Sequence, residues 1–453
     1  MKDLNHIQNF YFIGIGGIGM SAIARYLKAN GKYVAGYDRT SSELTRKLEE
    51  EGIEVCYEDQ LELVPKAITE EPENSVIVYT PAIPKDHKQF NKLKDQGFEL
   101  IKRAQLLGVI SQNKFTLAVA GTHGKTTTTA ILGHLLKETG AEVTAFLGGI
   151  SEDIQSNLIL KGNKVIVVEA DEFDRSFLNL SPNFAAVTSM DADHLDIYGD
   201  KSELEKSFRE FAAKIPKDGK LFVKNGLPLE GIKIGVEDDS DYSALDVRIE
   251  NGHYVFDLKT PTKNIKELKF NLPGKHNLLN AVTALAMAIE YGSPTDDDLA
   301  RALFSFKGVK RRFSYKIKRD DLVLIDDYAH HPTEISAVHQ AVREMYPNKK
   351  VIAVFQPHLF SRTRDFAEDF ASSLSGFDEV LIMDIYPARE LPIKGISSAW
   401  LLEKISNSNK ELVSKDEILG KLKSTDSEVI VMMGAGDIGE EVEKVKKALL
   451  NEA

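Results

Sequence analysis

The chain has 453 residues, which at about 150 residues per domain suggests two to four domains with buried cores. Hydrophobic residues make up 42% of the sequence and charged residues 28%, as is typical of a globular protein. With 69 acidic against 57 basic residues, the formal net charge is −12, which argues against a protein that binds nucleic acid or an anionic membrane surface. The one cysteine, Cys56, excludes an internal disulfide and a cysteine-rich metal site.

The N-terminal sequence MKDLNHIQNF lacks the basic, apolar and small-residue order of a signal peptide. No apolar stretch reaches the ~18 residues that a membrane span needs. We therefore expect a soluble, cytoplasmic protein with small-molecule ligands.

Short β-branched runs alternate with amphipathic stretches in three series, a pattern typical of α/β domains around mostly parallel sheets. The first series predicts strands at 10–15, 34–37 and 75–79 and a helix at 21–30. The second predicts strands at 115–120, 164–168 and 184–188, and the third at 322–325, 351–355, 379–383 and 428–433. We predict three α/β domains, at 1–106, 107–314 and 315–453.

The central series contains Gly121-Thr122-His123-Gly124-Lys125-Thr126 directly after an apolar strand and before a helix. Backbone N–H groups of such a turn converge on phosphate oxygens, a lysine reaches the outer phosphates, and a hydroxyl binds Mg²⁺. The usual P-loop has a further glycine where this chain has Val119, so the loop is a variant. The alternative is a glycine turn followed by a chance Lys-Thr pair.

Acidic residues follow the next two strands of the same series. Glu169-Ala170-Asp171-Glu172 ends one strand, and Asp191, Asp193 and His194 follow the other. Because open α/β sheets bind ligands at the carboxyl ends of their strands, these groups favour a nucleotide–Mg²⁺ site with Glu169 and His194 as ligands. Any single one of these acids could equally be solvated.

A second glycine cluster, Gly14-Ile15-Gly16-Gly17-Ile18-Gly19, follows the first strand, and Asp38 ends the next one. This matches the dinucleotide fingerprint, for which an NAD-dependent oxidoreductase is the obvious reading. The physical requirement is only a diphosphate at a helix N-terminus, so a nucleotide-diphosphate sugar fits as well. A packing turn without a ligand is the third alternative.

The third series carries DDYAHHPTE at 326–334 and QPHLFSRTR at 356–364, each after a strand. The paired histidines do not form an H-E-x-x-H zinc motif, and Pro332 disfavours a continuous metal-binding helix. Loops rich in Asp, His and Arg better suit ribose hydroxyls and small carboxylates. We read Gly434-Ala435-Gly436-Asp437 as a structural turn.

In this order, the motifs resemble those of the Mur ligase family of peptidoglycan synthesis across the whole chain. The segments that carry the resemblance are GIGGIGM at 14–20, GTHGKTTT at 121–128, EADEFDRSFL at 169–178, DADHLDIYG at 191–199, HNLLNA at 276–281, RRF at 311–313, DDYAHHPTE at 326–334 and the QPH–SRT segment.

The resemblance implies a Rossmann-like N-terminal domain for the UDP-sugar, a central P-loop-type ATPase domain and a Rossmann-like C-terminal domain for the amino acid. It implies an ATP-dependent ligase that joins L-alanine to the carboxylate of UDP-N-acetylmuramate through an acyl phosphate. It implies that Lys125 holds the β- and γ-phosphates, that Thr126 and Glu169 bind one Mg²⁺, and that His194 binds a second. The implied nucleotide site comprises Gly121, Thr122, His123, Gly124, Lys125, Thr126, Thr127, His276, Asn277, Asn280, Arg312 and Asp327. The implied UDP-sugar site comprises Gly14, Ile15, Gly16, Gly17, Ile18, Gly19, Asp38, Thr80 and Arg103, and the amino acid is expected at Tyr328, His330 and Arg362.

Lys125, Arg312 and His330 are the predicted catalytic residues. His330 either accepts a proton from the amine or only orients the substrate, and the sequence leaves both open. Leu359 departs from the family pattern, because some members carry Arg there.

Three functional alternatives remain beside the alanine-adding ligase: a recycling ligase that attaches an intact peptide to the same sugar, a nicotinamide-dependent oxidoreductase, and a nucleotide-regulated binding protein without chemistry.

Overall fold

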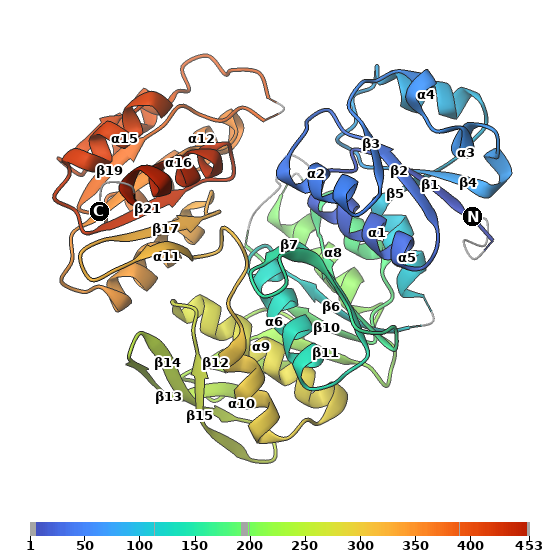
Figure 1. Ribbon diagram of the computed structural model, residues 1–453. Helices are drawn as coiled ribbons and strands as arrows, with labels where there is room; N and C mark the ends of the chain where they lie inside the picture. Colours follow the sequence, from blue (N-terminus) through green and yellow to red (C-terminus); the bar gives the residue numbers. More distant parts are fainter. Residues whose placement is uncertain (1–5, 113, 192–197, 199, 389, 451–453) are drawn as a thin grey trace. The chain divides into compact units, whose positions relative to one another are not determined.

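Three β-sheets, each the centre of one α/β domain, organise the part of the chain that the structure describes (Figure 1). The structure is a computed structural model, and it describes residues 6–112, 114–191, 198, 200–388 and 390–450. No helix in these ranges is long and apolar enough to cross a membrane.

The first domain is built on a five-stranded parallel sheet in the order β3-β2-β1-β4-β5. Its central strand is buried along its whole length, because a parallel sheet is covered on both faces. The strands are β1 (Asn9–Ile13), β2 (Tyr33–Tyr37), β3 (Glu54–Cys56), β4 (Ser75–Tyr79) and β5 (Glu99–Lys102). The helices are α1 (Ile18–Ala29), α2 (Glu43–Glu50), α3 (Lys66–Thr69), α4 (Lys88–Asp95) and α5 (Arg103–Ser111), with 3₁₀ turns η1 (Leu61–Leu63) and η2 (Pro72–Asn74).

The middle domain is built on a ten-stranded sheet in the order β15-β14-β13-β12-β11-β10-β6-β9-β7-β8. Its strands are β6 (Phe115–Ala120), β7 (Val143–Ser151), β8 (Ser156–Leu160), β9 (Val165–Ala170), β10 (Phe184–Val187), β11 (Lys220–Lys224), β12 (Ile232–Val236), β13 (Tyr242–Glu250), β14 (His253–Lys259) and β15 (Asn264–Phe270). Its helices are α6 (Lys125–Glu138), α8 (Lys201–Ala212), α9 (Lys275–Gly292) and α10 (Asp296–Ser305), with the 3₁₀ segment η3 (Phe173–Asn179).

The strand order of the middle sheet places the carboxyl ends of β10, β6 and β9 next to one another. Strand β6 lies between β10 and β9, all parallel, so the segments that follow them leave from one edge. Helix α6, which follows β6, is buried on every side from Thr126 to Leu136.

The C-terminal domain has a six-stranded sheet in the order β16-β17-β21-β18-β19-β20, in which β16 alone is antiparallel to its neighbour. Its strands are β16 (Ser314–Lys318), β17 (Val323–Asp327), β18 (Val351–Phe355), β19 (Glu379–Ile382), β20 (Lys410–Leu412) and β21 (Val429–Met433). Its helices are α11 (Pro332–Met345), α12 (Phe360–Asp365), α13 (Ala367–Leu374), α14 (Ser398–Lys404), α15 (Lys415–Ser424) and α16 (Ile438–Leu450).

The chain folds into two compact units. The first runs up to Leu245 and includes Asp257–Leu268 and Asn280–Phe306, so the first domain and most of the middle domain belong together. The second comprises Asp246–Phe256, Lys269–Leu279 and the chain from Lys307 onward.

The predicted fold class is confirmed, and each predicted strand is present within one or two residues of its expected ends. The first helix begins at Ile18, three residues before the predicted start, because the glycine turn itself runs into the helix. The hairpin β7–β8 and the strands β11–β15 were not predicted.

Candidate functional site

The loop between β6 and α6 adopts a conformation that its glycines make possible. Gly121 has φ +135° and Gly124, which precedes the first residue of α6, has φ +83°. A side chain at Gly121 would also lie 2.2 Å from the Thr188 hydroxyl, and one at Gly124 would lie 2.5 Å from the Asn280 amide oxygen. The loop therefore requires glycine at both positions.

Residues that follow β10 brace this loop from outside. The Ser189 hydroxyl accepts the His123 N–H at 2.7 Å and contacts the Thr122 hydroxyl at 2.9 Å. The Thr122 hydroxyl in turn accepts the Asp191 N–H. These contacts hold the loop open at the N-terminus of α6, where the helix dipole favours an anion.

The Lys125 ammonium lies inside this loop. It donates to the Gly121 carbonyl at 2.6 Å and lies 2.8 Å from the Glu172 carboxylate, whose side chain is fully buried. Burial lowers the pKa of Lys125, but the carboxylates of Glu172, Asp171 and Glu169 outweigh it, so the pKa lies above its ordinary value. Lys125 is therefore a charged group at neutral pH.

Thr126 and Glu169 form a pair of oxygen donors beside the loop. The Thr126 hydroxyl donates to both carboxylate oxygens of Glu169, at 3.1 and 3.0 Å. A side chain at Gly148 of β7 would lie 1.8 Å from a Glu169 oxygen, so the carboxylate fills the space that the glycine leaves. A hydroxyl and a carboxylate next to a phosphate loop fit the oxygen preference of Mg²⁺. His194, the other predicted metal ligand, and Asp193 lie outside the described residues.

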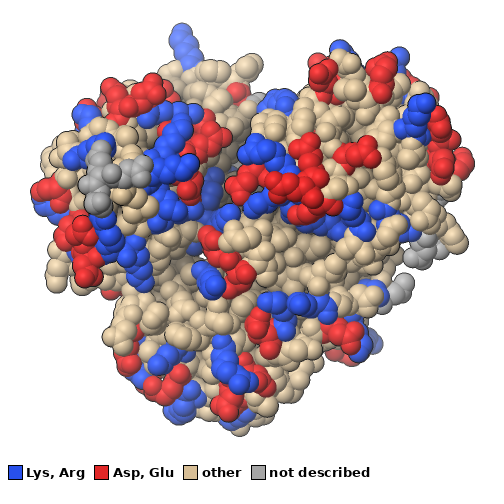
Figure 2. All heavy atoms as spheres, in the orientation of Figure 1, with Lys and Arg blue, Asp and Glu red and all other residues tan. Residues whose placement is uncertain are grey.

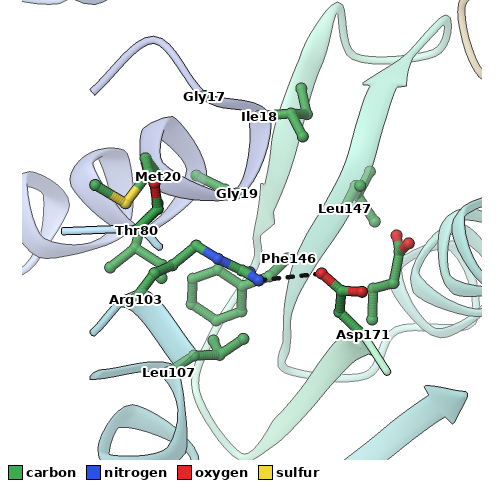
Figure 3. Close-up of a pocket in the computed structure, with 14 residues that line it drawn as sticks. Gly17, Ile18, Gly19, Met20, Thr80, Arg103, Leu107, Phe146, Leu147 and Asp171 are labelled. Atoms are coloured by element: carbon green, nitrogen blue, oxygen red, sulfur yellow. Dashed lines mark hydrogen bonds and ion pairs between the residues drawn. The ribbon is translucent and has the colours of Figure 1, made fainter. Parts of the chain in front are cut away.

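A cavity of about 260 Å³ lies between the first and middle domains (Figure 3). From the first domain, α1 and its glycine turn, Thr80, Arg103 and Leu107 line it. From the middle domain, β7 contributes Phe146, Leu147 and Gly148, and β9 and its end contribute Glu169 and Asp171. Glu169 thus borders both this cavity and the first turn of α6.

Arg103 brings positive charge to the cavity. Its guanidinium lies 3.3 Å from the Asp171 carboxylate (dashed in Figure 3). The preceding residue, Lys102, forms an ion pair with Asp174 at 3.0 Å. A side chain at Gly19 would lie 2.9 Å from the Arg103 guanidinium, so the arginine packs directly on the glycine turn.

The six residues of the first glycine motif divide into two groups. Gly17, Ile18 and Gly19 line the cavity, whereas the Gly14 and Ile15 N–H groups both donate to the Tyr37 carbonyl. The Gly16 N–H donates to the Asp38 carboxylate at 2.8 Å. The structure therefore brings Asp38 to the turn itself, and the second half of the motif is the part that faces the cavity.

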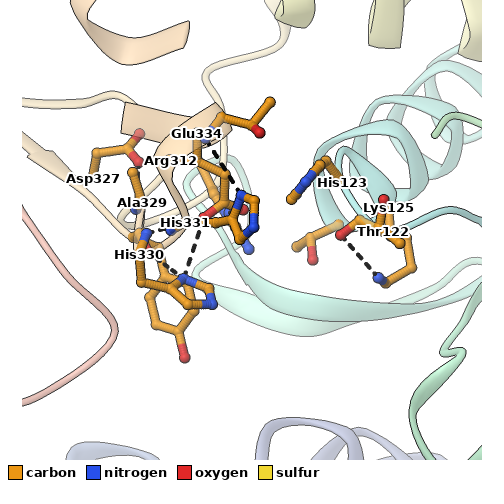
Figure 4. A network of polar contacts seen from close by, with 12 residues as sticks. Thr122, His123, Lys125, Arg312, Asp327, Ala329, His330, His331 and Glu334 are labelled. Carbon is orange, nitrogen blue, oxygen red and sulfur yellow. Dashed lines mark hydrogen bonds and ion pairs between the residues drawn. The ribbon is translucent and has the colours of Figure 1, made fainter. Parts of the chain in front are cut away.

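In the C-terminal domain, the segment after β17 gathers the other candidate residues (Figure 4). His330 contacts the Tyr328 carbonyl through Nδ1 at 2.9 Å, and Glu334 accepts the N–H groups of His330 and His331. His331 caps α11 by accepting the Thr333 N–H. Burial lowers the pKa of His330, Glu334 raises it and Arg362 lowers it, with a net decrease, so the imidazole is neutral at neutral pH.

Two arginines flank the Tyr328 ring, with the Arg311 and Arg312 guanidinium carbons 5.1 and 5.0 Å from its centroid. The Asp327 carboxylate accepts the N–H groups of Phe313 and Ala329, at 2.6 and 2.7 Å, and burial raises its pKa to about 6. These contacts fix the end of β17 with Tyr328, His330 and Arg312 around it.

The HNLLNA segment opens α9. The Asn277 amide donates to the Pro273 carbonyl, and the Asn280 amide oxygen packs on Gly124 of the phosphate loop. Thr127 lies in the first turn of α6 and is buried.

Two groups of residues at the cavity and the phosphate loop escaped the sequence-based prediction. Phe146, Leu147 and Gly148 lie on β7, which the sequence analysis does not predict. The only local sign that another group packs closely on this segment is the pair Gly148-Gly149. Asp171 and Glu172 stood in a recognised motif but received no role.

On the face shown in Figure 2, basic and acidic side chains alternate, with no broad field of one sign.

Comparison with known proteins identifies the family. The Mur ligase family catalytic domain matches residues 9–115, the Mur ligase middle domain matches 119–288, and the Mur ligase glutamate ligase domain matches 311–436. The chain belongs to the Mur ligase family. This confirms the family expected from its motifs.

Relatives of this Mur ligase are similar over their full length. It is 77% identical to the UDP-N-acetylmuramate–L-alanine ligase of Christiangramia forsetii over 453 residues, covering 100% of both chains. It is 63% identical to the enzyme of that name from Flavobacterium psychrophilum over 447 residues, covering 99% of each.

Solved structures show the same architecture. The UDP-N-acetylmuramate–alanine ligase of Thermotoga maritima superposes with a TM-score of 0.83 at 27% identity, over 98% of this chain and 100% of that one. A murein peptide ligase from Psychrobacter arcticus has a TM-score of 0.68 at 21% identity, over 98% and 99% of the two chains, which shows a shared fold.

Proposed function

We propose that this Mur ligase joins L-alanine to the carboxylate of UDP-N-acetylmuramate with consumption of ATP, in peptidoglycan precursor synthesis. The observation that carries the proposal is the 77% identity, over the full length of both chains, to a protein named for that activity. The geometry supports it, because the phosphate loop and the cavity lie in one compact unit. Glu169 contacts both, since it lines the cavity and accepts a hydrogen bond from Thr126 next to the loop.

The UDP-sugar is assigned to the cavity. Gly17 and Gly19 offer backbone without obstructing side chains, and Arg103 supplies the charge for a diphosphate or carboxylate. Thr80 lines the same cavity, while Gly14, Ile15, Gly16 and Asp38 shape the turn that carries it. The muramyl carboxylate then lies toward Glu169 and the phosphate loop.

ATP is assigned to the loop at 121–127, with Lys125 on the β- and γ-phosphates. His276, Asn277 and Asn280 are the proposed adenine-side residues, and Arg312 and Asp327 the proposed phosphate and ribose contacts. Mg²⁺, held by Thr126 and Glu169 with His194 at a second ion, would neutralise phosphate charge. We keep domain boundaries near 106 and 314 as part of the proposal, with the nucleotide site extending past the second boundary to Asp327.

The reaction has two steps. The sugar carboxylate attacks the γ-phosphorus, which gives an acyl phosphate and releases ADP. The alanine amine then attacks the acyl carbon, and phosphate leaves from the tetrahedral intermediate to give the amide. Lys125 and Arg312 counter the charge that builds up on the transferring phosphoryl group, so catalysis consists mainly of positioning and charge neutralisation.

Tyr328, His330 and Arg362 are the proposed alanine site. Because Nδ1 of His330 is directed at the Tyr328 carbonyl, its proton belongs on Nδ1, and Nε2 is left as a hydrogen-bond acceptor. A neutral Nε2 can orient the incoming ammonium group or accept its proton.

The test is phosphate release from ATP with UDP-N-acetylmuramate and, in turn, L-alanine, glycine, L-serine and the intact tripeptide. The proposal expects L-alanine to give the highest kcat/KM. A preference for the peptide would identify the recycling ligase instead. Quenching of NADH fluorescence by the protein, without phosphate release in any mixture, would favour the oxidoreductase.

A further inference from the structure

Glu172 is a buried carboxylate to which the proposed reaction assigns no task. Its side chain has no exposed surface, and its two oxygens lie 2.9 and 2.8 Å from the Lys125 ammonium. A buried charge is costly unless it is paired, so the contact with Lys125 is a substantial interaction of the phosphate loop.

The chain holds this carboxylate firmly in place. The Glu172 carbonyl accepts the Tyr198 hydroxyl at 2.6 Å and the Arg175 N–H at 2.9 Å. Two and three residues after it, Asp174 and Arg175 both adopt the left-handed conformation, with φ of 53° and 52°. Two consecutive non-glycine residues in that region are strained, and such strain persists only where the surroundings enforce it.

The neighbouring Asp171 points to a different partner. Its carboxylate pairs with Arg103 at the cavity, whereas that of Glu172 pairs with Lys125 in the phosphate loop. Lys125 and Arg103, two of the cations proposed to bind substrate anions, therefore each already contact an internal carboxylate.

We propose that Glu172 is an internal counter-anion that holds the Lys125 ammonium before the nucleotide binds. The Glu172 carboxylate then competes with the nucleotide phosphates for the Lys125 ammonium. The inference rests on the proposed function, because it takes the loop to be the nucleotide site. A phosphate oxygen on Lys125 brings a second anion to the same cation, and the repulsion between phosphate and carboxylate weakens nucleotide binding. Weaker binding of ADP in turn favours its release after each turnover.

The test compares binding of ADP, without and with Mg²⁺, to the full-length parent, Glu172→Gln and Glu172→Asp by calorimetry. Removing the charge should tighten ADP about three- to tenfold in Glu172→Gln. Glu172→Asp, which withdraws the carboxylate but keeps its charge, should bind with intermediate affinity. If the Gln variant does not fold, the Asp variant must still bind ADP more tightly than the parent. Glu138→Gln at the other end of α6 is the matched control, since it removes a carboxylate that pairs with Lys137 and not with Lys125, and its ADP affinity should stay close to the parental value.

The increase in Tm on addition of ADP provides a readout that a purely structural role would not move. Without ADP, Glu172→Gln should have a lower Tm because Lys125 loses its counter-ion, and saturating ADP should raise its Tm more than that of the parent. Equal or weaker ADP binding by both variants would overturn the inference, as would a Tm deficit that ADP leaves unchanged. Weakened binding only in the presence of Mg²⁺ would make Glu172 a metal ligand and overturn it too. A parent protein that binds no ADP would refute the proposed nucleotide site itself.

Discussion

Lys125 is the residue on which the proposed phosphoryl transfer depends most. Its ammonium is fixed by the Gly121 carbonyl and by carboxylates, and it is charged at neutral pH. Lys125→Ala should reduce kcat by at least ~10³-fold, which is the effect of losing a main electrostatic stabiliser of a transition state. The UDP-sugar affinity, measured by calorimetry, should stay near the parental value because the cavity is lined by other residues. Near-normal turnover would refute the assignment.

Arg362 is the proposed partner of the alanine carboxylate. Its charge contributes to lowering the pKa of His330, so the two side chains belong to one electrostatic cluster. A guanidinium can hold a carboxylate through two parallel N–H···O bonds, which a lysine cannot reproduce. Arg362→Lys should therefore reduce kcat/KM for L-alanine by roughly 10²-fold. The measurement is steady-state kinetics with L-alanine varied and the other substrates saturating; an unchanged KM for alanine with a raised KM for ATP would move Arg362 to the nucleotide site.

His330 gives the reaction a pH dependence of known sign. Burial lowers the pKa of His330 below the ordinary imidazole value of 6.5, so the imidazole stays neutral at pH 6.5. Only at lower pH does Nε2 become protonated and cease to be a hydrogen-bond acceptor. The rate with subsaturating L-alanine should therefore fall on the acid side of pH 6.5, and His330→Gln should lack this limb of the profile relative to the parent. A limb with the same midpoint in His330→Gln would assign it to another group.

At the scale of single elements, the turn that opens α1 depends on glycine where it meets Arg103. A methyl group at Gly19 would lie 2.9 Å from the guanidinium and displace it from the cavity. Gly19→Ala should raise the KM for the UDP-sugar about tenfold and leave that for ATP nearly unchanged, since Arg103 would lose its position over the turn. Gly420→Ala in α15 is the matched control, because a methyl group there meets nothing within 4 Å. An equal rise in both KM values would show that the turn supports the whole enzyme and not the sugar site.

Strands whose residues are nearly all apolar can be recognised from the sequence. Strands in which buried positions alternate with exposed charged residues are harder to recognise. Strands β1 and β6 have one polar residue each among apolar ones, and the sequence predicts β6 to the residue and β1 within two residues. Strand β15, NIKELKF, has only three buried positions, so its charges hide the strand pattern.

The same limit applies to the candidate site. A glycine turn after a strand is a local signal, so both glycine motifs were recognisable. The contact between Lys125 and Glu172 joins residues 47 positions apart, and Phe146 reaches the cavity only because β7 pairs beside β9. Such contacts depend on strand order, which local periodicity does not encode.

At the scale of the molecule, the two proposed substrate sites of the first unit must keep a fixed distance for the sugar carboxylate to reach the γ-phosphate. Helix α1 packs on the hairpin β7–β8, and the fully buried Asn157 of β8 connects them. Its amide donates to the Ile18 carbonyl at 2.6 Å and to the Ser21 hydroxyl at 2.9 Å. Its oxygen accepts from Arg25, whose guanidinium also pairs with Glu51 at 2.7 Å.

This arrangement predicts that Asn157 keeps the glycine turn aligned with the middle domain. Asn157→Ala leaves Arg25 and the Ile18 carbonyl without this partner inside the protein and should destabilise it by ~2–4 kcal/mol, measured as a lower Tm. Asn157→Asp preserves an acceptor for Arg25 but loses both donated bonds, which isolates the anchoring of α1. Because the turn carries Gly17–Gly19, both variants should raise the KM for the UDP-sugar several-fold. ADP affinity should stay parental, since the loop at Lys125 is braced by Thr188 and Ser189. Asn179→Ala, at an exposed site, serves as the control. If Asn157→Asp kept the parental KM for the sugar, the Arg25 contact alone would account for the alignment and the role assigned to the amide donors would be wrong.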